Sequence, residues 1–281
     1  MRKREKFTSK PVELYYFIDP INPECWSLEP ILKKLTLEYG GYFSIVRVLT
    51  SRLSHLNLSS QRSSHLALWQ RWEEVALQSG MSCDGTLWLE NPILEPYKIS
   101  IAIKAATMQN RRAGAEFLRK IQEALFIEKK DVTLPKNLLA IAKELNLDES
   151  EFLKDLASDA TAKAFQNDLD ISAEMFVEET PAFVFFNNQP EDEGLKITGV
   201  YSYGVYEQIL QECLGTPLNK AELPTILDFL KRYDLVASQE ISVIYQMDVT
   251  QVNKRMHELL LAQKVEKITA KHGYFWRLKR L

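Results

Sequence analysis

Few cysteines, few histidines and no long hydrophobic run are the first features of this 281-residue chain. The three cysteines, Cys25, Cys83 and Cys213, are odd in number and far apart, so they form neither a disulfide framework nor a Cys-x-x-Cys metal motif. The four histidines have no metal-ligand spacing. No apolar stretch approaches the ~20 residues that span a membrane. We therefore expect no cofactor, no structural metal and no membrane segment.

Sequence motifs of several enzyme classes are also missing. The chain has no Walker loop, no glycine-rich dinucleotide fingerprint and no Ser-His-Asp arrangement. The basic residues 1–10 are not followed by the apolar region and cleavage site of a signal peptide, so we expect a cytoplasmic protein. The hydrophobic content of 46%, the charged content of 26% and the net charge of −3 are typical of a globular chain.

A strand followed by a well-marked helix start is the central motif that the sequence does contain. The apolar run from Val12 to Ile18 is rich in residues that favour a buried strand. After a turn, Asn22 is a favourable N-cap and Pro23 a favourable first helical residue. Glu24 then places negative charge in the first turn, where the helix dipole stabilises it. Strand, turn and helix start in this order resemble thioredoxin-like proteins, whose helix opens with Cys-Pro-x-Cys.

The first cysteine of that pattern is replaced by asparagine here. Asn22 can cap a helix but cannot attack a disulfide, and Cys25 has no vicinal thiol to resolve a mixed disulfide. We interpret Cys25 as a small buried residue. Pro30 predicts a kink in the helix, because proline removes a backbone hydrogen bond. The degenerate redox motif therefore consists of Asn22, Pro23, Glu24 and Cys25.

A second match to thioredoxin-like proteins is Thr180-Pro181, at the start of an apolar run over 179–186. Such proteins have a cis-proline before the third strand, facing the helix start. Proline lowers the cost of a cis bond to ~0.5–1 kcal/mol, against ~3 kcal/mol for other residues. We predict a cis bond between Thr180 and Pro181, and an exposed backbone there that pairs with an extended partner segment. An ordinary proline at a strand start is the alternative.

The pattern around these motifs indicates an α/β chain. Further strands are predicted at 42–49 and 196–200, and a closing helix at 204–215. Between the second and third strands the sequence is helical, with apolar periodicity at 65–78, 97–110, 113–127, 136–145 and 149–165. We predict a DsbA-like thioredoxin domain over residues 1–216, with a helical insert at about 51–170.

The composition changes in residues 217–281, which carry 11 Lys and Arg against 7 Asp and Glu. Periodicity predicts helices at 222–233, 239–246 and 250–263, the last capped by Thr250, and a hairpin of strands 265–269 and 274–278. This order is typical of a small winged-helix-like domain. The third helix carries polar residues suited to DNA, but the modest positive charge makes nucleic-acid binding unfavourable. A DNA-binding regulator therefore stays an alternative.

The combined features resemble the SpxH (YjbH) family of Firmicutes over essentially the whole chain. The resemblance implies a non-enzymatic cytosolic adaptor that binds the transcriptional regulator Spx and promotes its degradation by the ClpXP protease, with ClpX contacted directly or indirectly. Some relatives carry a zinc-binding, His- and Cys-rich N-terminus, which residues 1–10 lack. The residues that carry the resemblance are Phe17-Ile18-Asp19-Pro20, Pro23-Glu24-Cys25-Trp26, Leu28-Glu29-Pro30 and Thr180-Pro181-Ala182-Phe183.

Partner binding is predicted where the two motifs meet. A thioredoxin fold has a groove there, and without an attacking thiol docking becomes reversible. A rival function is a glutathione-dependent isomerase or transferase of the DsbA-like class, in which a polar residue replaces the first cysteine and activates glutathione. That rival predicts a ligand cavity lined by the helical insert. The candidate partner-binding residues are Asn22, Pro23, Trp26, Thr180 and Pro181.

Overall fold

The computed structural model describes residues 10–50, 62–187 and 194–279. Within these residues the main sheet has strand order β2-β1-β3-β4. β1 and β2 are parallel, and the other two pairs are antiparallel. This is the thioredoxin arrangement that the sequence predicted. The strands are β1 (Val12–Ile18), β2 (Phe43–Leu49), β3 (Ala182–Asn187) and β4 (Leu195–Thr198).

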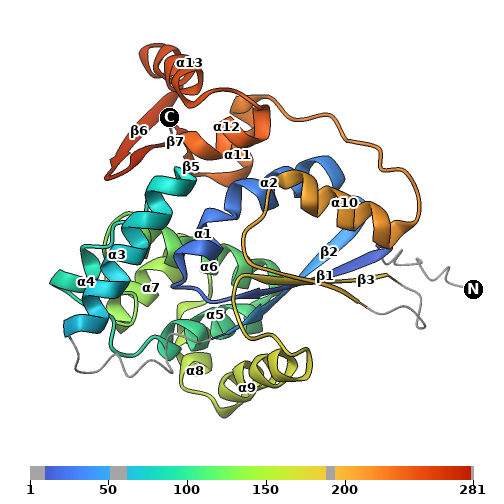
Figure 1. Cartoon of the computed structure of the whole chain (residues 1–281). Coiled ribbons are helices and arrows are strands. Elements are labelled where there is room, and N and C mark those ends of the chain that lie inside the picture. The colour runs from blue at the N-terminus through green and yellow to red at the C-terminus, as the bar shows by residue number, and fades with distance from the viewer. Residues whose placement is uncertain (1–9, 51–61, 188–193, 280–281) are drawn as a thin grey trace, which may run out of the picture.

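Helices cover both faces of this sheet (Figure 1). On one face lie α2 (Glu29–Tyr39) and α10 (Tyr203–Leu214), which pack on the even-numbered side chains of β1 such as Leu14. On the other face α9 (Asp159–Glu174) packs near the odd-numbered Phe17. The alternation of a strand therefore sends its apolar side chains into two separate layers.

The first helix is interrupted, as Pro30 predicted. α1 (Pro23–Ser27) ends one residue before α2 begins, and Leu28 joins them. Proline cannot donate the backbone hydrogen bond that would continue α1 through this point. The short helix α1 is therefore a separate helix from α2.

The helical insert differs from its prediction in two places. The helix predicted at 149–165 is wrong, because the chain breaks at Ala157 and Ser158 caps a new helix by accepting from the Thr161 amide. The short helix α4 (Leu87–Glu90) was not predicted, since four residues give no helical period. The other insert helices are α3 (Arg62–Ser79), α5 (Tyr97–Gln109), α6 (Arg111–Phe126), α7 (Pro135–Glu144) and α8 (Glu149–Leu156).

The C-terminal domain has the predicted winged-helix order, helix, helix, helix and hairpin. The strand β5 was missed because it has only two residues. The first helix begins later than predicted, at Ile226, because Thr225 is its cap, and the third is capped by Asp248 rather than Thr250. Its elements are α11 (Ile226–Tyr233), β5 (Val236–Ala237), α12 (Ser238–Tyr245), α13 (Val249–Leu261), β6 (Val265–Ala270) and β7 (Gly273–Leu278).

A buried ion network joins the C-terminal domain to the body. The Glu240 carboxylate on α12 is fully buried and pairs with Lys33 of α2. It also accepts from Arg119 of α6 at 3.2 Å, and Arg119 in turn pairs with Glu29 at 3.3 Å and Glu123 at 2.8 Å. Buried charges are costly unless they are paired, and here the pairs connect α12 of the C-terminal domain to α2 and α6 of the body.

Candidate functional site at the degenerate redox motif

Asn22 joins the two motifs that lie 158 residues apart in the sequence. Its side-chain oxygen accepts from the Glu24 amide at 2.8 Å, so it caps α1. Its Nδ2 donates to the carbonyl of Thr180 at 2.8 Å and to the Thr180 hydroxyl at 3.2 Å. The Thr180–Pro181 peptide bond is cis, as the sequence predicted. The asparagine therefore replaces the attacking thiol with a hydrogen-bonded clamp.

This clamp changes what the backbone next to the cis-proline can do. The sequence predicted an exposed backbone there that pairs with a partner segment. The Thr180 carbonyl already accepts from Asn22, so an incoming strand has to share it. Thr180 and Asn22 are both partly exposed, so their side chains still reach the surface.

Cys25 lies directly behind the clamp and is fully buried. Burial raises the pKa of its thiol, and the Asp19 and Glu24 carboxylates raise it further. The hydroxyl of Tyr16 donates to the Cys25 carbonyl at 3.2 Å, which fixes the backbone here. A protonated, inaccessible thiol neither attacks a disulfide nor binds a metal. The chemistry left at the motif is hydrogen bonding and packing.

Trp26 does not lie on a binding surface, and the expectation that it contacts a partner is wrong. Its side chain is fully buried because α6 and the hairpin of the C-terminal domain cover it. The ring stacks on Phe126 and Phe275, with centroids 5.4 and 6.4 Å away. The Arg119 guanidinium lies 4.4 Å from its centroid, and its Nε1 donates to the Ser82 carbonyl at 2.9 Å. Trp26 is therefore a centre of domain packing.

Pro23 and Pro181 are also buried, so they shape the site without offering much surface. The exposed apolar surface comes instead from a turn that sequence reasoning missed. Val200 and Tyr201, which follow β4, are 47% and 44% exposed. The preceding Gly199 donates its amide to the Pro181 carbonyl at 2.7 Å, which places this turn beside the cis-proline.

A buried tyrosine supports that turn from below. The hydroxyl of Tyr206 donates to the Gly199 carbonyl and accepts from the Tyr201 amide, each at 3.4 Å. Burial raises the pKa of Tyr206 to about 12, so the hydroxyl keeps its proton at neutral pH. Gly199 has a φ of +100°, which only glycine adopts readily. A glycine after a strand was the one signal in the sequence that could have marked this turn.

The helical insert holds the other side of the motif. Arg71 of α3 forms an ion pair with Glu24 and another with Glu74 at 3.3 Å. Its side chain remains about half exposed, so this pair lies at the surface. Arg71 therefore holds the first turn of α1 against α3.

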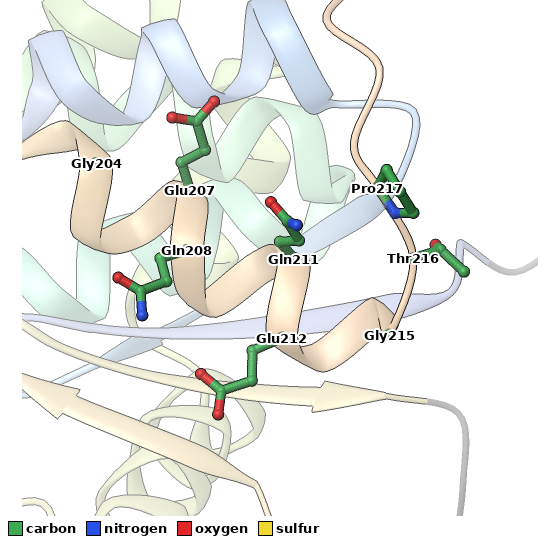
Figure 2. Close-up of a pocket in the computed structure, with 8 residues that line it drawn as sticks. All are labelled: Gly204, Glu207, Gln208, Gln211, Glu212, Gly215, Thr216 and Pro217. Carbon is green, nitrogen blue, oxygen red and sulfur yellow. The ribbon is translucent and has the colours of Figure 1, made fainter.

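Neither of two hollows elsewhere on the molecule reaches this motif. One, of about 560 Å³, runs along the outer side of α10 and is lined by polar residues such as Gln208 and Gln211 (Figure 2). Its Glu207 is held by Lys220 at 3.1 Å. The other, of about 920 Å³, lies between α2, β2 and α6. Neither is lined by Asn22 or Cys25, so neither places a ligand against the degenerate motif.

No group of three or more His, Cys, Asp or Glu side chains among residues 10–50, 62–187 and 194–279 is placed to hold a metal ion. No helix in those same ranges is both long and apolar enough to span a bilayer.

Comparison with solved structures gives the same fold at low sequence identity. A putative protein disulfide isomerase from Nitrosomonas europaea is 17% identical, with a TM-score of 0.63 over 73% of this chain and 98% of that one. A probable DsbA oxidoreductase from Streptomyces coelicolor is 16% identical, with a TM-score of 0.54 over 76% and 100%. A thioredoxin family profile matches residues 15–208. The fold and site thus define a DsbA-type thioredoxin-like protein without its attacking cysteine.

Curated relatives identify the family. The ClpXP adapter protein SpxH of Bacillus subtilis is 47% identical over 270 residues, which cover 95% of this chain and 89% of the relative. The protein of the same name from Bacillus licheniformis is 44% identical over 284 residues, covering 99% and 94%. The chain belongs to the SpxH family of ClpXP adapter proteins.

Proposed function

We propose that this protein is a non-enzymatic cytoplasmic adaptor that binds Spx and delivers it to the ClpXP protease. The observation that carries the proposal is the Asn22 clamp, which keeps the thioredoxin site closed to disulfide chemistry while leaving its rim exposed. The buried Cys25 thiol supports the same conclusion. Relatives that are 47% and 44% identical over most of this chain are named ClpXP adapter proteins.

The Spx-binding surface is proposed to be the rim of Asn22, Thr180, Val200 and Tyr201. Two exposed apolar side chains beside hydrogen-bonding groups form the mixed surface that protein interfaces use. Pro23 and Pro181 support this rim from below, and Trp26 stabilises the fold behind it. Because no thiol is available, binding here is reversible and independent of redox state.

Reconstituted degradation tests the adaptor function. Purified ClpXP and Spx are incubated under reducing conditions with no adaptor, with this protein or with its Cys25→Ala variant, and Spx loss is followed with time. We expect both proteins to accelerate degradation equally. Calorimetric titration with Spx measures the binding step separately. No acceleration and no binding would contradict the proposal.

The rim is tested by substitution within the same assay. We expect Val200→Ala combined with Tyr201→Ala to weaken Spx binding at least ~10-fold, because exposed aromatic residues at an interface centre often contribute 1–2 kcal/mol or more. Leu261→Ala is the matched control, since Leu261 is 85% exposed on α13, in the C-terminal domain. Unchanged affinity of the double variant, with loss in variants of the insert or C-terminal domain, would place the surface elsewhere.

A glutathione-dependent isomerase or transferase is the second candidate, and the thioredoxin-like neighbours favour it only at the level of fold. Glutathione titration decides it. Saturable binding that Asn22→Ala abolishes, together with turnover of a disulfide or thioether substrate, would favour this enzyme over the adaptor. We expect neither, because Cys25 is buried and the Asn22 amide is engaged by Thr180.

A further inference from the structure

The outer edge of β2 presents peptide groups that no strand of the described residues pairs with. β1 and β2 are parallel, with the Val12 amide donating to the Tyr42 carbonyl and the Thr50 amide to Ile18. In a β-strand the N–H and C=O groups of successive residues point alternately to the two sides. The backbone groups of the even-numbered residues of β2 therefore hydrogen-bond to β1. Those of Phe43, Ile45, Arg47 and Leu49 point away from it. Within residues 10–50, 62–187 and 194–279, no strand pairs with this edge.

A hydrogen bond at the end of β2 independently supports the outward direction of these peptide groups. The Leu49 amide donates to the buried Asp168 carboxylate of α9 at 2.7 Å, so the end of the edge is capped by a side chain. The part from Phe43 to Arg47 instead lines the groove of about 920 Å³. One wall of the groove is formed by α2 and α6, and Tyr233 at the end of α11 lies at another side. Residues of the free edge therefore line this groove.

The charges in this groove are unbalanced. Each of its carboxylates has a basic partner, as Glu116 has Arg112 at 2.7 Å and Glu144 has Lys120 at 2.9 Å. Arg47 and Arg232 line the same groove, and neither forms an ion pair within the described ranges. Both arginines are exposed. Burial raises the pKa of the nearby Tyr233, and the positive charges of Arg232 and Arg47 act in the opposite direction. The excess positive charge is therefore concentrated near one end of the free edge.

A buried donor in the same groove also lacks an acceptor. Gln122 of α6 lines it and is 1% exposed. Among the residues that the structure describes, its Nε2 has no hydrogen-bond partner, although an unsatisfied buried amide costs about 1–3 kcal/mol. Because this nitrogen is shielded from solvent, a segment in the groove would reach it only if the side chain moved.

We propose that this groove binds an extended, acidic segment of a partner protein, which adds to β2 as an extra strand. The outward peptides of Phe43, Ile45 and Arg47 supply the backbone hydrogen bonds, as in other cases of strand addition. Arg47 and Arg232, which are exposed, bind carboxylates of the segment. The rim at Asn22 and this groove are separate surfaces, so the inference holds whether or not Spx is the partner.

A synthetic peptide tests this binding mode directly. The probe is an end-capped hexapeptide of alternating glutamate and valine, and the control peptide replaces glutamate with lysine. Binding to the full chain is measured by NMR titration, and hydrogen exchange is followed at the Ile45 and Arg47 amides. We expect saturable binding of the acidic peptide, slower exchange at both amides and at least tenfold weaker binding of the basic peptide.

Matched variants separate the contributions of charge and backbone. We expect the double variant Arg47→Glu, Arg232→Glu to bind the acidic peptide at least tenfold more weakly. Arg111 is an exposed arginine outside the groove, so Arg111→Glu should leave the affinity for the peptide unchanged. Ile45→Pro removes one outward amide and should also abolish binding, with Ile45→Val as control and thermal melting as the check of folding.

Several results would overturn this inference. Equal binding of the two peptides, equal binding by the charge variants, or binding without slower exchange at Ile45 and Arg47 would each exclude strand addition by an acidic segment. Self-association through the same edge would appear in ultracentrifugation as a dimer that Ile45→Pro dissociates. That outcome would assign the edge to a second copy of this chain.

Discussion

At the residue scale, one side chain decides whether this thioredoxin site is reactive. A cysteine at position 22 would place a thiol at a helix start, where the dipole stabilises the thiolate. Asn22 uses the same position to cap α1 and to bind Thr180. Cys25, the last residue of the motif, then has no second cysteine at position 22 and is fully buried. The geometry of the motif is therefore set by local hydrogen bonding and burial.

Native alkylation tests this description of the cysteines. Burial raises the pKa of Cys25 and of Cys83, so both stay protonated as the pH rises through the usual range of a free thiol. We expect iodoacetamide to label the partly exposed Cys213 first, and Cys25 and Cys83 only after denaturation. Peptide mass spectrometry between pH 7 and pH 9 measures the rates. Labelling of native Cys25 that rises with pH as a free thiol's does would contradict the buried assignment.

At the element scale, α12 is anchored by Glu240, a carboxylate in its first turn. Glu240 accepts from the Ala237 amide at 2.6 Å at the start of this helix, and it also pairs with Lys33 and Arg119 of the body. One carboxylate therefore satisfies a helix end and a domain interface together. Burial alone would raise the pKa of Glu240, but Arg119 and Lys33 lower it overall.

Replacing this carboxylate should strongly destabilise the protein. We expect Glu240→Gln to lower the unfolding free energy by about 3–5 kcal/mol, because it leaves Lys33 and Arg119 buried without their partner. Urea denaturation at neutral pH measures the change. Glu258→Gln is the control, since its pair with Arg255 is exposed, and it should cause a far smaller change.

The same variant has a defined pH dependence. Since the folded pKa of Glu240 is lower than the unfolded value, its stabilising contribution is complete above about pH 4.5. It is lost as the pH falls through the folded pKa and the carboxylate becomes protonated. The stability difference between wild type and Glu240→Gln should therefore shrink on acidification. A difference that stays constant from pH 7 to pH 3 would contradict the ionised network.

At the scale of the whole molecule, the C-terminal domain completes the core of the body. Phe275 of β7 is 1% exposed and stacks on Trp26, so a hairpin of one domain covers the motif helix of the other. Lys271 and His272, at the hairpin turn, also pair with Glu73 of α3 at 2.7 and 2.9 Å. Figure 1 shows the C-terminal domain beside α1 and α3. The two domains should therefore unfold together.

Removing the hairpin aromatic tests that coupling. We expect Phe275→Ala to cost about 3–5 kcal/mol and to shift the whole urea transition, because it leaves a cavity between the domains. Circular dichroism and tryptophan fluorescence should give coincident transitions. Phe176→Ala, on a side chain that is 78% exposed, should change stability by less than about 0.5 kcal/mol. Two separate transitions in the wild type would show that the domains unfold independently.

Local signals in the sequence determined much of this protein. Asn22 and Pro23 marked the start of α1, Pro30 marked its kink, and Thr180-Pro181 marked the cis bond. Each acts through its own backbone or through a few neighbours, so its effect can be predicted without the rest of the chain. The order of apolar periods gave both the thioredoxin fold and the winged-helix arrangement.

The tertiary structure alone decided which of these residues reach the surface. Trp26 was predicted on the partner-binding surface, but Phe275, about 250 positions later, stacks on it and helps to bury it. Val200 and Tyr201 are exposed because the turn after β4 is held against the cis-proline. Burial depends on contacts between distant segments, and residue type and spacing do not specify those partners. The sequence therefore determined the motif and the absence of its first cysteine, and folding determined which side chains around it are exposed.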